Sequence, residues 1–320
     1  MHAGTAEQRA VHQLLAEIGP RWGADIRGNS QIVKDAYAPM LASAPNDGIV
    51  VIRNTPYGPH ARQLMDIFRP VTSQPEGVLV FVHGGAFVRG DKQTSPEIYD
   101  NVLYWFARHG FLGVNIEYRL APEAAFPVGA DDVAMAMAWL HGHVSDYGAD
   151  PARILLVGHS AGGTHVASYA YDPTLHHLGK YAAGIVLVSA RLRADTSVEN
   201  PNAEGVRAYF GVDPKLYETR SPVSHAGSND IPVFVVTAEF ENPLLDIYGL
   251  EFAYRLSLFR RRAPRYLRML GHNHMSIVAH INSGEDTLGP AILDFFDTEC
   301  VQGHDPVERI SQRAAYAVSG

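Results

Sequence analysis

The chain has 320 residues, of which 46% are hydrophobic and 19% charged, and this length and composition are those of a globular protein with a sizeable core. A formal net charge of −8 without a long Lys/Arg run excludes an ordinary nucleic-acid partner. Cys300 is the only cysteine, which excludes an intrachain disulfide. No signal-peptide pattern and no apolar run of membrane-spanning length is visible, so we expect a soluble cytoplasmic protein with no membrane partner.

The first 45 residues carry helical patterns only. Residues 5–18 predict an amphipathic helix, because Thr5 and Gln8 have the spacing of a capping box and the apolar residues fall on one face. Gly19 and Pro20 then end this helix. A second short helix is expected near residues 30–37. We interpret residues 1–45 as an N-terminal helical segment attached to the domain that follows.

From residue 46 onward, short apolar runs alternate with helical patterns. Such alternation is typical of a mostly parallel sheet with helices on both faces. The predicted strands are 49–52, 63–68, 77–83, 111–117, 153–157, 184–189, 231–237 and 265–270. Residues 46–300 therefore predict one α/β domain. Within it, residues 190–230 interrupt the alternation with prolines and aromatic residues, as a lid or binding insertion does, and residues 301–320 are left as a C-terminal tail.

The segment GHSAG at 158–162 matches the G-x-S-x-G motif, in which a serine sits on a tight turn between a strand and a helix. A buried-strand pattern precedes it, and a run of small residues that can open a helix follows it. Glycines at both ends remove side chains that would collide with neighbouring backbone. Ser160 is therefore the predicted nucleophile.

A second glycine-containing turn, HGGAF at 83–87, follows another buried-strand pattern. It resembles the HGGG-type turn of lipases and esterases, which supplies backbone N–H groups to the oxyanion of the reaction intermediate. Ala86 stands in place of the third glycine and still supplies an N–H group. We expect the oxyanion hole to be built from Gly84, Gly85, Ala86 and Ala161.

A serine hydroxyl needs a neighbouring base, because it is a weak nucleophile at neutral pH. In enzymes with the G-x-S-x-G turn, the catalytic histidine follows the last strand of the sheet. GHNHMS at 271–276 occupies that place, so His274 is the predicted base and His272 the alternative. The H-x-H spacing also suits zinc, but no third ligand stands at a recognisable spacing, and no metal or cofactor is expected.

The acid that orients this histidine is expected after strand 231–237. Glu241 lies in the loop at that point and is the first choice. Asp246 lies further along, at the start of a predicted helix, where a carboxylate also serves as a helix cap. The sequence leaves both residues open as candidates.

Taken together, HGGAF, EYRLAPEAAFP at 117–127 and GHSAGG resemble the esterases related to hormone-sensitive lipase. The segments at 55–70 and 271–276 are similar to the kynurenine-formamidase and feruloyl-esterase-like branch. The resemblance covers about residues 50 to 298 and implies an α/β-hydrolase fold, a metal-independent triad and a small helical cap. It also implies an acid just after the strand, where Glu241 stands without a gap and Asp246 would follow one insertion.

These observations predict a serine carboxylesterase acting on short- to medium-chain or aryl esters. An arylformamidase-type C–N hydrolase uses the same machinery and remains open, and an inactive ligand-binding member of the fold is the third alternative. The small-molecule substrate would enter a pocket for which the following residues are candidates: Phe87, His159, Tyr209 and Phe210. A homodimer is compatible with the sequence.

Overall fold

The computed structural model of the protein describes residues 5–71, 73–285 and 287–301. Its centre is an eight-stranded sheet with the strand order β1-β2-β4-β3-β5-β6-β7-β8. The strands are β1 (Ile49–Pro56), β2 (Leu64–Pro70), β3 (Gly77–Val82), β4 (Phe111–Ile116), β5 (Ile154–His159), β6 (Gly184–Val188), β7 (Val233–Phe240) and β8 (Arg265–Asn273). Each of the eight predicted strands is present.

The sheet is parallel apart from one end. β1 pairs with β2, and β2 with β4, in antiparallel fashion, whereas the pairs from β3 to β8 are parallel. The carboxyl ends of the parallel strands therefore meet at one edge, which is where α/β sheets bind their ligands. This arrangement confirms the predicted α/β-hydrolase fold.

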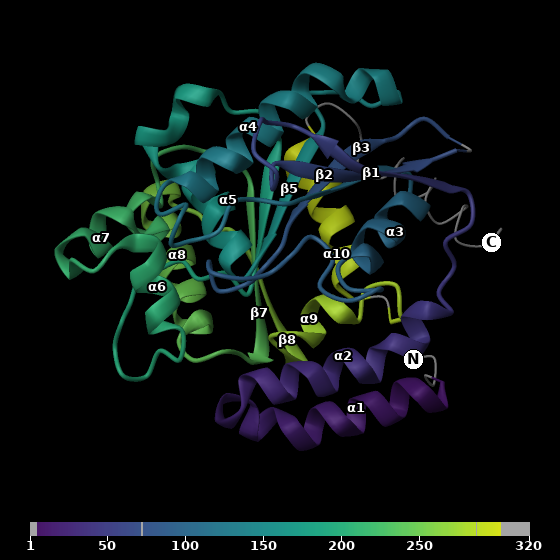
Figure 1. Ribbon diagram of the computed structural model, residues 1–320, viewed down its shortest axis with the longest axis horizontal. Helices are drawn as coiled ribbons and strands as arrows, with labels where there is room; N and C mark the ends of the chain where they lie inside the picture. The colour runs from purple at the N-terminus through teal and green to yellow at the C-terminus, as the bar shows by residue number, and fades with distance from the viewer. Residues whose placement is uncertain (1–4, 72, 286, 302–320) are drawn as a thin grey trace.

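Helices cover both faces of the sheet (Figure 1). They are α1 (Ala6–Ile18), α2 (Ile26–Ala42), α3 (Asp100–Arg108), α4 (Val128–His143), α5 (Ala161–Tyr171), α6 (Ala203–Phe210), α7 (Tyr217–Arg220), α8 (Leu245–Arg260), α9 (Ser276–Ala279) and α10 (Leu288–Phe295). One buried cluster joins α3 and α10 to one face of the sheet, and a second joins α4, α5 and α8 to the other. The alternation of side chains along β3 shows why: Leu79 belongs to the first cluster, and Val78 and Val80 belong to the second.

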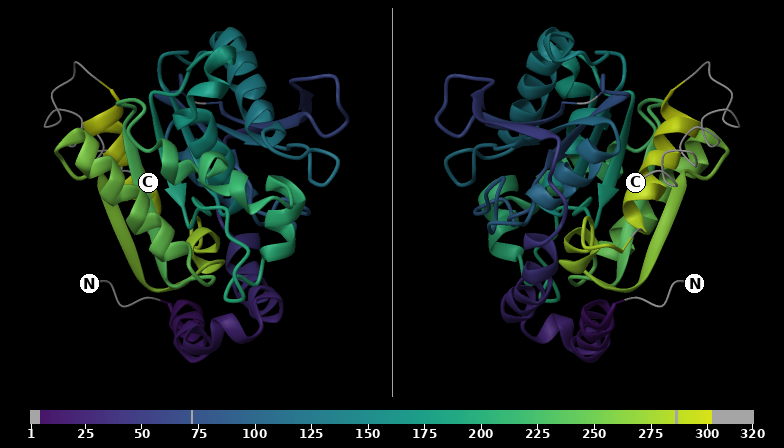
Figure 2. Two further views of the ribbon diagram at one scale, coloured as in Figure 1. Left: turned by 90° about the vertical axis from the view of Figure 1, so that its left-hand side faces the viewer. Right: turned by 90° about the vertical axis from the view of Figure 1, so that its right-hand side faces the viewer.

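The N-terminal helices lie across the carboxyl ends of β7 and β8 (Figures 1 and 2). α1 has the predicted capping box, in which Thr5 and Gln8 exchange hydrogen bonds. Leu15 and Trp22 are buried in the same cluster as α3 and α10. The second helix is longer than the predicted 30–37, because Asp25 caps its start by accepting from the N–H of Gly28, and the helix runs past Pro39.

The segment 190–230 contains α6, α7 and short 3₁₀ turns. Its aromatic residues form a small separate core under α6. β7 runs to Phe240, three residues beyond the predicted end, so that Glu241 follows the strand directly. Of the predicted tail 301–320, all but residue 301 lies outside the described residues.

Candidate active site

Ser160 lies on the turn between β5 and α5, with a backbone φ of 56° and ψ of −121°. A positive φ is strained for a residue with a side chain, and it lifts the hydroxyl above the carboxyl edge of the sheet. The flanking glycines are required by space: a Cβ on Gly162 would lie 2.2 Å from the carbonyl oxygen of Val82. The Ser160 N–H donates to Val188 of the next strand, which holds the turn to the sheet.

The HGGAF loop follows β3 and touches the same turn. A Cβ on Gly84 would lie 3.0 Å from Cβ of Ser160, so the two backbones approach closely. Gly85, Ala86 and Phe87 all have positive φ values. All four residues of the predicted oxyanion hole line one cleft with Ser160. In the described part of the chain, none of their N–H groups donates to a backbone carbonyl. The Gly84 N–H faces the Tyr99 hydroxyl, whereas those of Gly85, Ala86 and Ala161 are free for a ligand.

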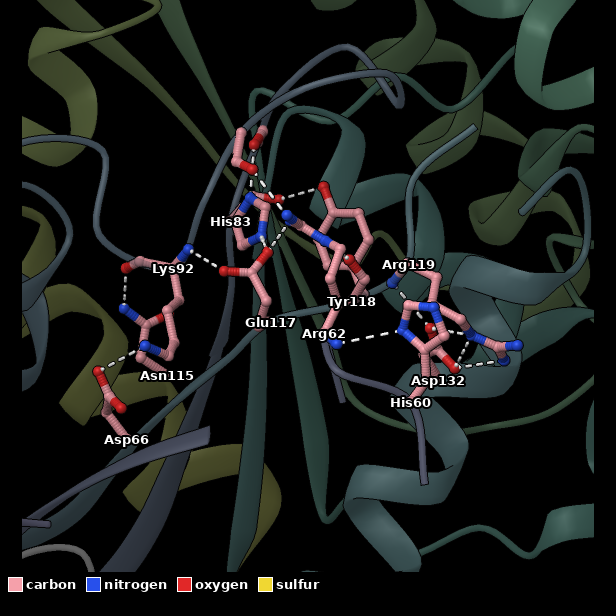
Figure 3. Close-up of polar contacts among 12 residues, drawn as sticks. His60, Arg62, Asp66, His83, Lys92, Asn115, Glu117, Tyr118, Arg119 and Asp132 are labelled. Atoms are coloured by element: carbon pink, nitrogen blue, oxygen red, sulfur yellow. Dashed lines mark hydrogen bonds and ion pairs between the residues drawn. The ribbon is translucent and has the colours of Figure 1, made fainter. Parts of the chain in front are cut away.

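A buried polar network holds this loop in place (Figure 3). His83 is fully buried, and its ring nitrogens face the Gly84 carbonyl at 2.6 Å and Glu117 Oε1 at 3.0 Å. Glu117 also accepts from the Lys92 N–H at 2.9 Å and pairs with Arg62. Burial alone would raise the pKa of Glu117, but the hydrogen bond and charge of His83, together with hydrogen bonds from Asp91 and the Lys92 N–H, lower this pKa. The network ties both ends of the loop to the sheet.

His274 stands between the serine and a carboxylate. Its Nε2 lies 3.0 Å from Ser160 Oγ, and its Nδ1 lies 2.8 Å from Glu241 Oε2. Glu241 is buried and accepts further hydrogen bonds from the Ala238 N–H at 2.9 Å and from the Ser189 hydroxyl. The structure thus brings together the first-choice base and acid in a single hydrogen-bonded line with Ser160.

The two alternatives point elsewhere. His272 is buried, with its ring nitrogens 3.2 Å from Ser276 Oγ and 3.0 Å from Glu285 Oε1. Asp246 lies in the first turn of α8, and its Oδ1 accepts from the N–H of Ile247. Neither forms a hydrogen bond with Ser160 or His274, so both alternatives are excluded as members of this hydrogen-bonded line.

His159 contacts the backbone of His274. Its Nε2 lies 2.9 Å from the His274 carbonyl, and its Nδ1 lies 3.2 Å from the Tyr99 hydroxyl. Burial lowers the pKa of His159 well below its usual value, and the neighbouring His274 lowers it further. The neutral ring can donate to the carbonyl and accept from Tyr99, which fixes the backbone of the histidine that faces Ser160. The sequence reasoning did not single out Tyr99, which lies in a loop without a motif.

The serine opens into a cleft of about 1170 Å³. Of the four residues proposed for the pocket, Phe87 and His159 line this cleft, and Tyr209 and Phe210 do not. These two side chains are fully buried in the small core under α6, where Tyr209 stacks on Phe87 with ring centroids 4.7 Å apart. The prediction that they line the pocket was wrong, because their rings pack against the base of the HGGAF loop rather than toward the cleft.

The cleft walls include residues that no motif marked. The first turns of α2 contribute Arg27 and Lys34, and the loop after β6 contributes Arg191. Among the described residues, no group of three or more His, Cys, Asp or Glu side chains is placed to hold a metal ion. None of the described helices is both long enough and apolar enough to cross a membrane.

Comparison with known proteins agrees with this architecture. Residues 65–180 match the family model described as BD-FAE. Esterase LipC of Mycobacterium tuberculosis is 36% identical over 244 residues, which are 69% of this chain and 59% of that protein. Esterase LipQ of the same organism is 32% identical over 203 residues, 58% of this chain and 47% of that protein. The chain thus spans about half the length of these curated relatives.

Solved structures show the same fold. The hyperthermophilic esterase from the archaeon Pyrobaculum calidifontis superposes with a TM-score of 0.67 at 22% identity, over 91% of this chain and 98% of that one. At this identity the likeness establishes the fold and nothing finer. The matched family segment, the esterase relatives and the shared fold together show that the chain is similar to the carboxylesterases of the α/β-hydrolase fold.

Proposed function

We propose that the protein is a serine carboxylesterase with Ser160 as nucleophile, His274 as base and Glu241 as the acid that orients it. The observation that carries the proposal is the hydrogen-bonded line from Glu241 Oε2 through both nitrogens of His274 to Ser160 Oγ, at 2.8 and 3.0 Å. These distances are within the range for proton transfer. The esterase names of the sequence relatives support the same reaction class.

In the proposed reaction, His274 takes the proton of Ser160 as its oxygen attacks the ester carbonyl. The free N–H groups of Gly85, Ala86 and Ala161 stabilise the negative charge on the carbonyl oxygen. The carbon–oxygen bond to the alcohol then breaks, and His274 returns the proton to the departing alcohol. Water, deprotonated by the same histidine, releases the acyl group and restores the serine.

Short- to medium-chain and aryl esters are the proposed substrates. A cleft of about 1170 Å³ is slightly larger than most small-molecule sites, so it has room for such esters. Its walls come from the HGGAF loop, the start of α2 and the residues that begin α6. Both helical segments therefore act as the cap that determines which esters fit.

The test is hydrolysis of p-nitrophenyl acetate, butyrate and octanoate, beside N-formylkynurenine, by wild type and Ser160→Ala. Ester turnover by wild type and a loss of at least about 10⁴-fold in the variant are expected. Ser73→Ala is the matched control, since Ser73 is exposed and precedes β3 at the opposite edge of the sheet. Faster formamide turnover would move the assignment to C–N hydrolysis, and an inert wild type that also resists a fluorophosphonate label would refute the proposal.

A further inference from the structure

Arg191 lies beside the nucleophile, in the loop that follows β6. Its N–H donates to the Ser160 carbonyl at 3.3 Å, and its own carbonyl accepts from Thr164 Oγ1 at 2.6 Å. Both ends of its peptide are therefore anchored to the turn that carries Ser160 and to the helix behind it. The residue lines the same cleft as Ser160 and His274.

The guanidinium of Arg191 is buried without a direct partner. The residue is only 4% exposed, and its Nη1 is a buried atom with no hydrogen-bond partner. Within the described ranges, no oxygen accepts a hydrogen bond from any nitrogen of this side chain. Buried charges in proteins are ordinarily paired, because an unpaired one loses its hydration without compensation. An arginine in this state is therefore prepared for an anion that arrives with the ligand.

The carboxylate of Asp195 does not fill this role. It attracts Arg191 through space but forms no ion pair with it, since its oxygens accept from Ser197 and from the Tyr248 hydroxyl at 2.8 to 3.0 Å. Burial lowers the pKa of Arg191, and Tyr248 and Asp195 oppose that effect. A guanidinium stays protonated despite such a shift, so the cleft contains a fixed positive charge.

The charge of the cleft wall differs in sign from that of the chain. The whole protein has a formal net charge of −8. The charged residues that line the cleft, histidines aside, are four cations, Arg27, Lys34, Arg89 and Arg191, and two carboxylates, Asp25 and Glu204. Asp25 is partly used as the cap of α2. A positively charged cleft in an acidic protein attracts anionic ligands selectively.

We propose that the preferred substrates are esters that carry a carboxylate close to the scissile bond, and that Arg191 binds this carboxylate. This inference rests on the ester hydrolysis proposed above and adds the chemical class of the substrate. The planar guanidinium can bind a carboxylate through two parallel hydrogen bonds. The carboxylate belongs either to the acyl part or to the alcohol part of the ester, and the chemistry at Arg191 is the same in both cases.

Two pairs of esters distinguish these sources. For the acyl part, p-nitrophenyl hydrogen adipate is compared with its methyl ester. For the leaving group, para-acetoxybenzoate is compared with its methyl ester. In the pair whose carboxylate reaches Arg191, wild type is expected to show a kcat/KM about 10- to 100-fold higher for the carboxylate form than for its methyl ester. This factor corresponds to the energy of one hydrogen bond between charged groups. Preference for the neutral twin in both pairs would overturn the proposal.

Variants separate recognition from structure. Arg191→Gln is expected to remove the preference for the carboxylate form through KM, and Arg191→Lys to retain part of it. Arg207→Gln is the matched control, because it removes one positive charge from an exposed position of α6 that is outside the cleft lining, and the preference should persist. A preference that survives unchanged in Arg191→Gln would contradict the assignment.

Binding without turnover makes the inference independent of catalysis. Adipate and para-hydroxybenzoate, the acidic products of the two series, are titrated calorimetrically into Ser160→Ala with and without Arg191→Gln. Binding that requires Arg191 supports the anion site even where no ester is hydrolysed, in which case only the esterase proposal fails. Turnover of neutral esters without Arg191-dependent binding or preference leaves the esterase intact and overturns the anion site.

Discussion

Replacing Glu241 with glutamine is expected to disable His274 while preserving the fold. The two carboxylate oxygens have different partners. Oε1 accepts from the Ala238 N–H at 2.9 Å and from Ser189, whereas Oε2 faces the Asn242 N–H at 3.2 Å and His274 Nδ1 at 2.8 Å. An amide has one accepting oxygen, and the closer backbone donor together with the serine favours placing that oxygen at the Oε1 position. The amide NH₂ group then faces His274.

That orientation reverses the tautomer of the imidazole. The NH₂ group donates to Nδ1, so the ring proton moves to Nε2, which then donates to Ser160 Oγ instead of accepting its proton. An equivalent change of tautomer in a serine protease lowers kcat about 10⁴-fold. We therefore expect Glu241→Gln to lose about 10³- to 10⁴-fold in kcat, equivalent to about 4 to 5.5 kcal/mol of transition-state stabilisation.

The assay is p-nitrophenyl butyrate hydrolysis under saturating conditions, with circular dichroism to verify folding. Asp246→Asn is the matched control, because this carboxylate hydrogen-bonds to the N–H of Ile247 at the start of α8, and it should change kcat less than about threefold. A folded Glu241→Gln enzyme with nearly full kcat, or a large loss in Asp246→Asn alone, would refute the reasoning.

Three further changes test the packing around the site. Leu15→Ala, at a position 1% exposed, should lower the free energy of unfolding by about 2 to 5 kcal/mol in urea titrations, and an unchanged midpoint would mean that α1 is not docked. Ala86→Gly relieves a φ of 55° and should raise the free energy of unfolding by about 1 kcal/mol, whereas a lower midpoint would show that φ is not strained. The stabilising contribution of Glu285 depends on pH. Burial raises the pKa of this carboxyl, but hydrogen bonds from His272 and His12 and the charges of His280 and His272 together lower it from 4.5 to about 2. Its contribution to stability is therefore complete above pH 4.5 and is lost as the pH falls toward 2. The difference in the free energy of unfolding between wild type and Glu285→Gln should become smaller from pH 6 to pH 2.5. A difference that stays constant over this range would exclude the linkage.

The sheet and the hydrogen-bonded line from Ser160 through His274 to Glu241 could both be predicted from the sequence, and for the same reason. Parallel strands end at one edge, so residues placed directly after predicted strands are neighbours in space even when far apart along the chain. The choice between Glu241 and Asp246 required the end of β7, which extends three residues beyond the predicted 237, to Phe240. Strand ends depend on pairing with β8, and no local pattern encodes that pairing.

The cleft walls were much less predictable. Tyr209 is an aromatic residue of the kind that often lines a pocket, yet its ring is buried in the small core beside α6. Arg191 resembles any loop arginine until the backbone bond to Ser160 places it beside the nucleophile. Such positions depend on how the helical segments lie on the sheet, which is a matter of tertiary packing. The cytoplasmic location, the homodimer and the catalytic roles of Ser160, His274 and Glu241 stay predictions.

The docking of the N-terminal helices on β7 and β8 has a consequence for biosynthesis. Trp22 donates from Nε1 to Asn242 Oδ1 at 2.8 Å, a contact between residues 220 positions apart. The apolar faces of α1 and the turn after it therefore leave the ribosome long before their partners exist. Contacts of such large sequence separation form late and slowly, and apolar surface exposed in the meantime invites aggregation. The rate of translation and the binding of chaperones while residues 46–232 are being made should therefore determine the yield of folded protein.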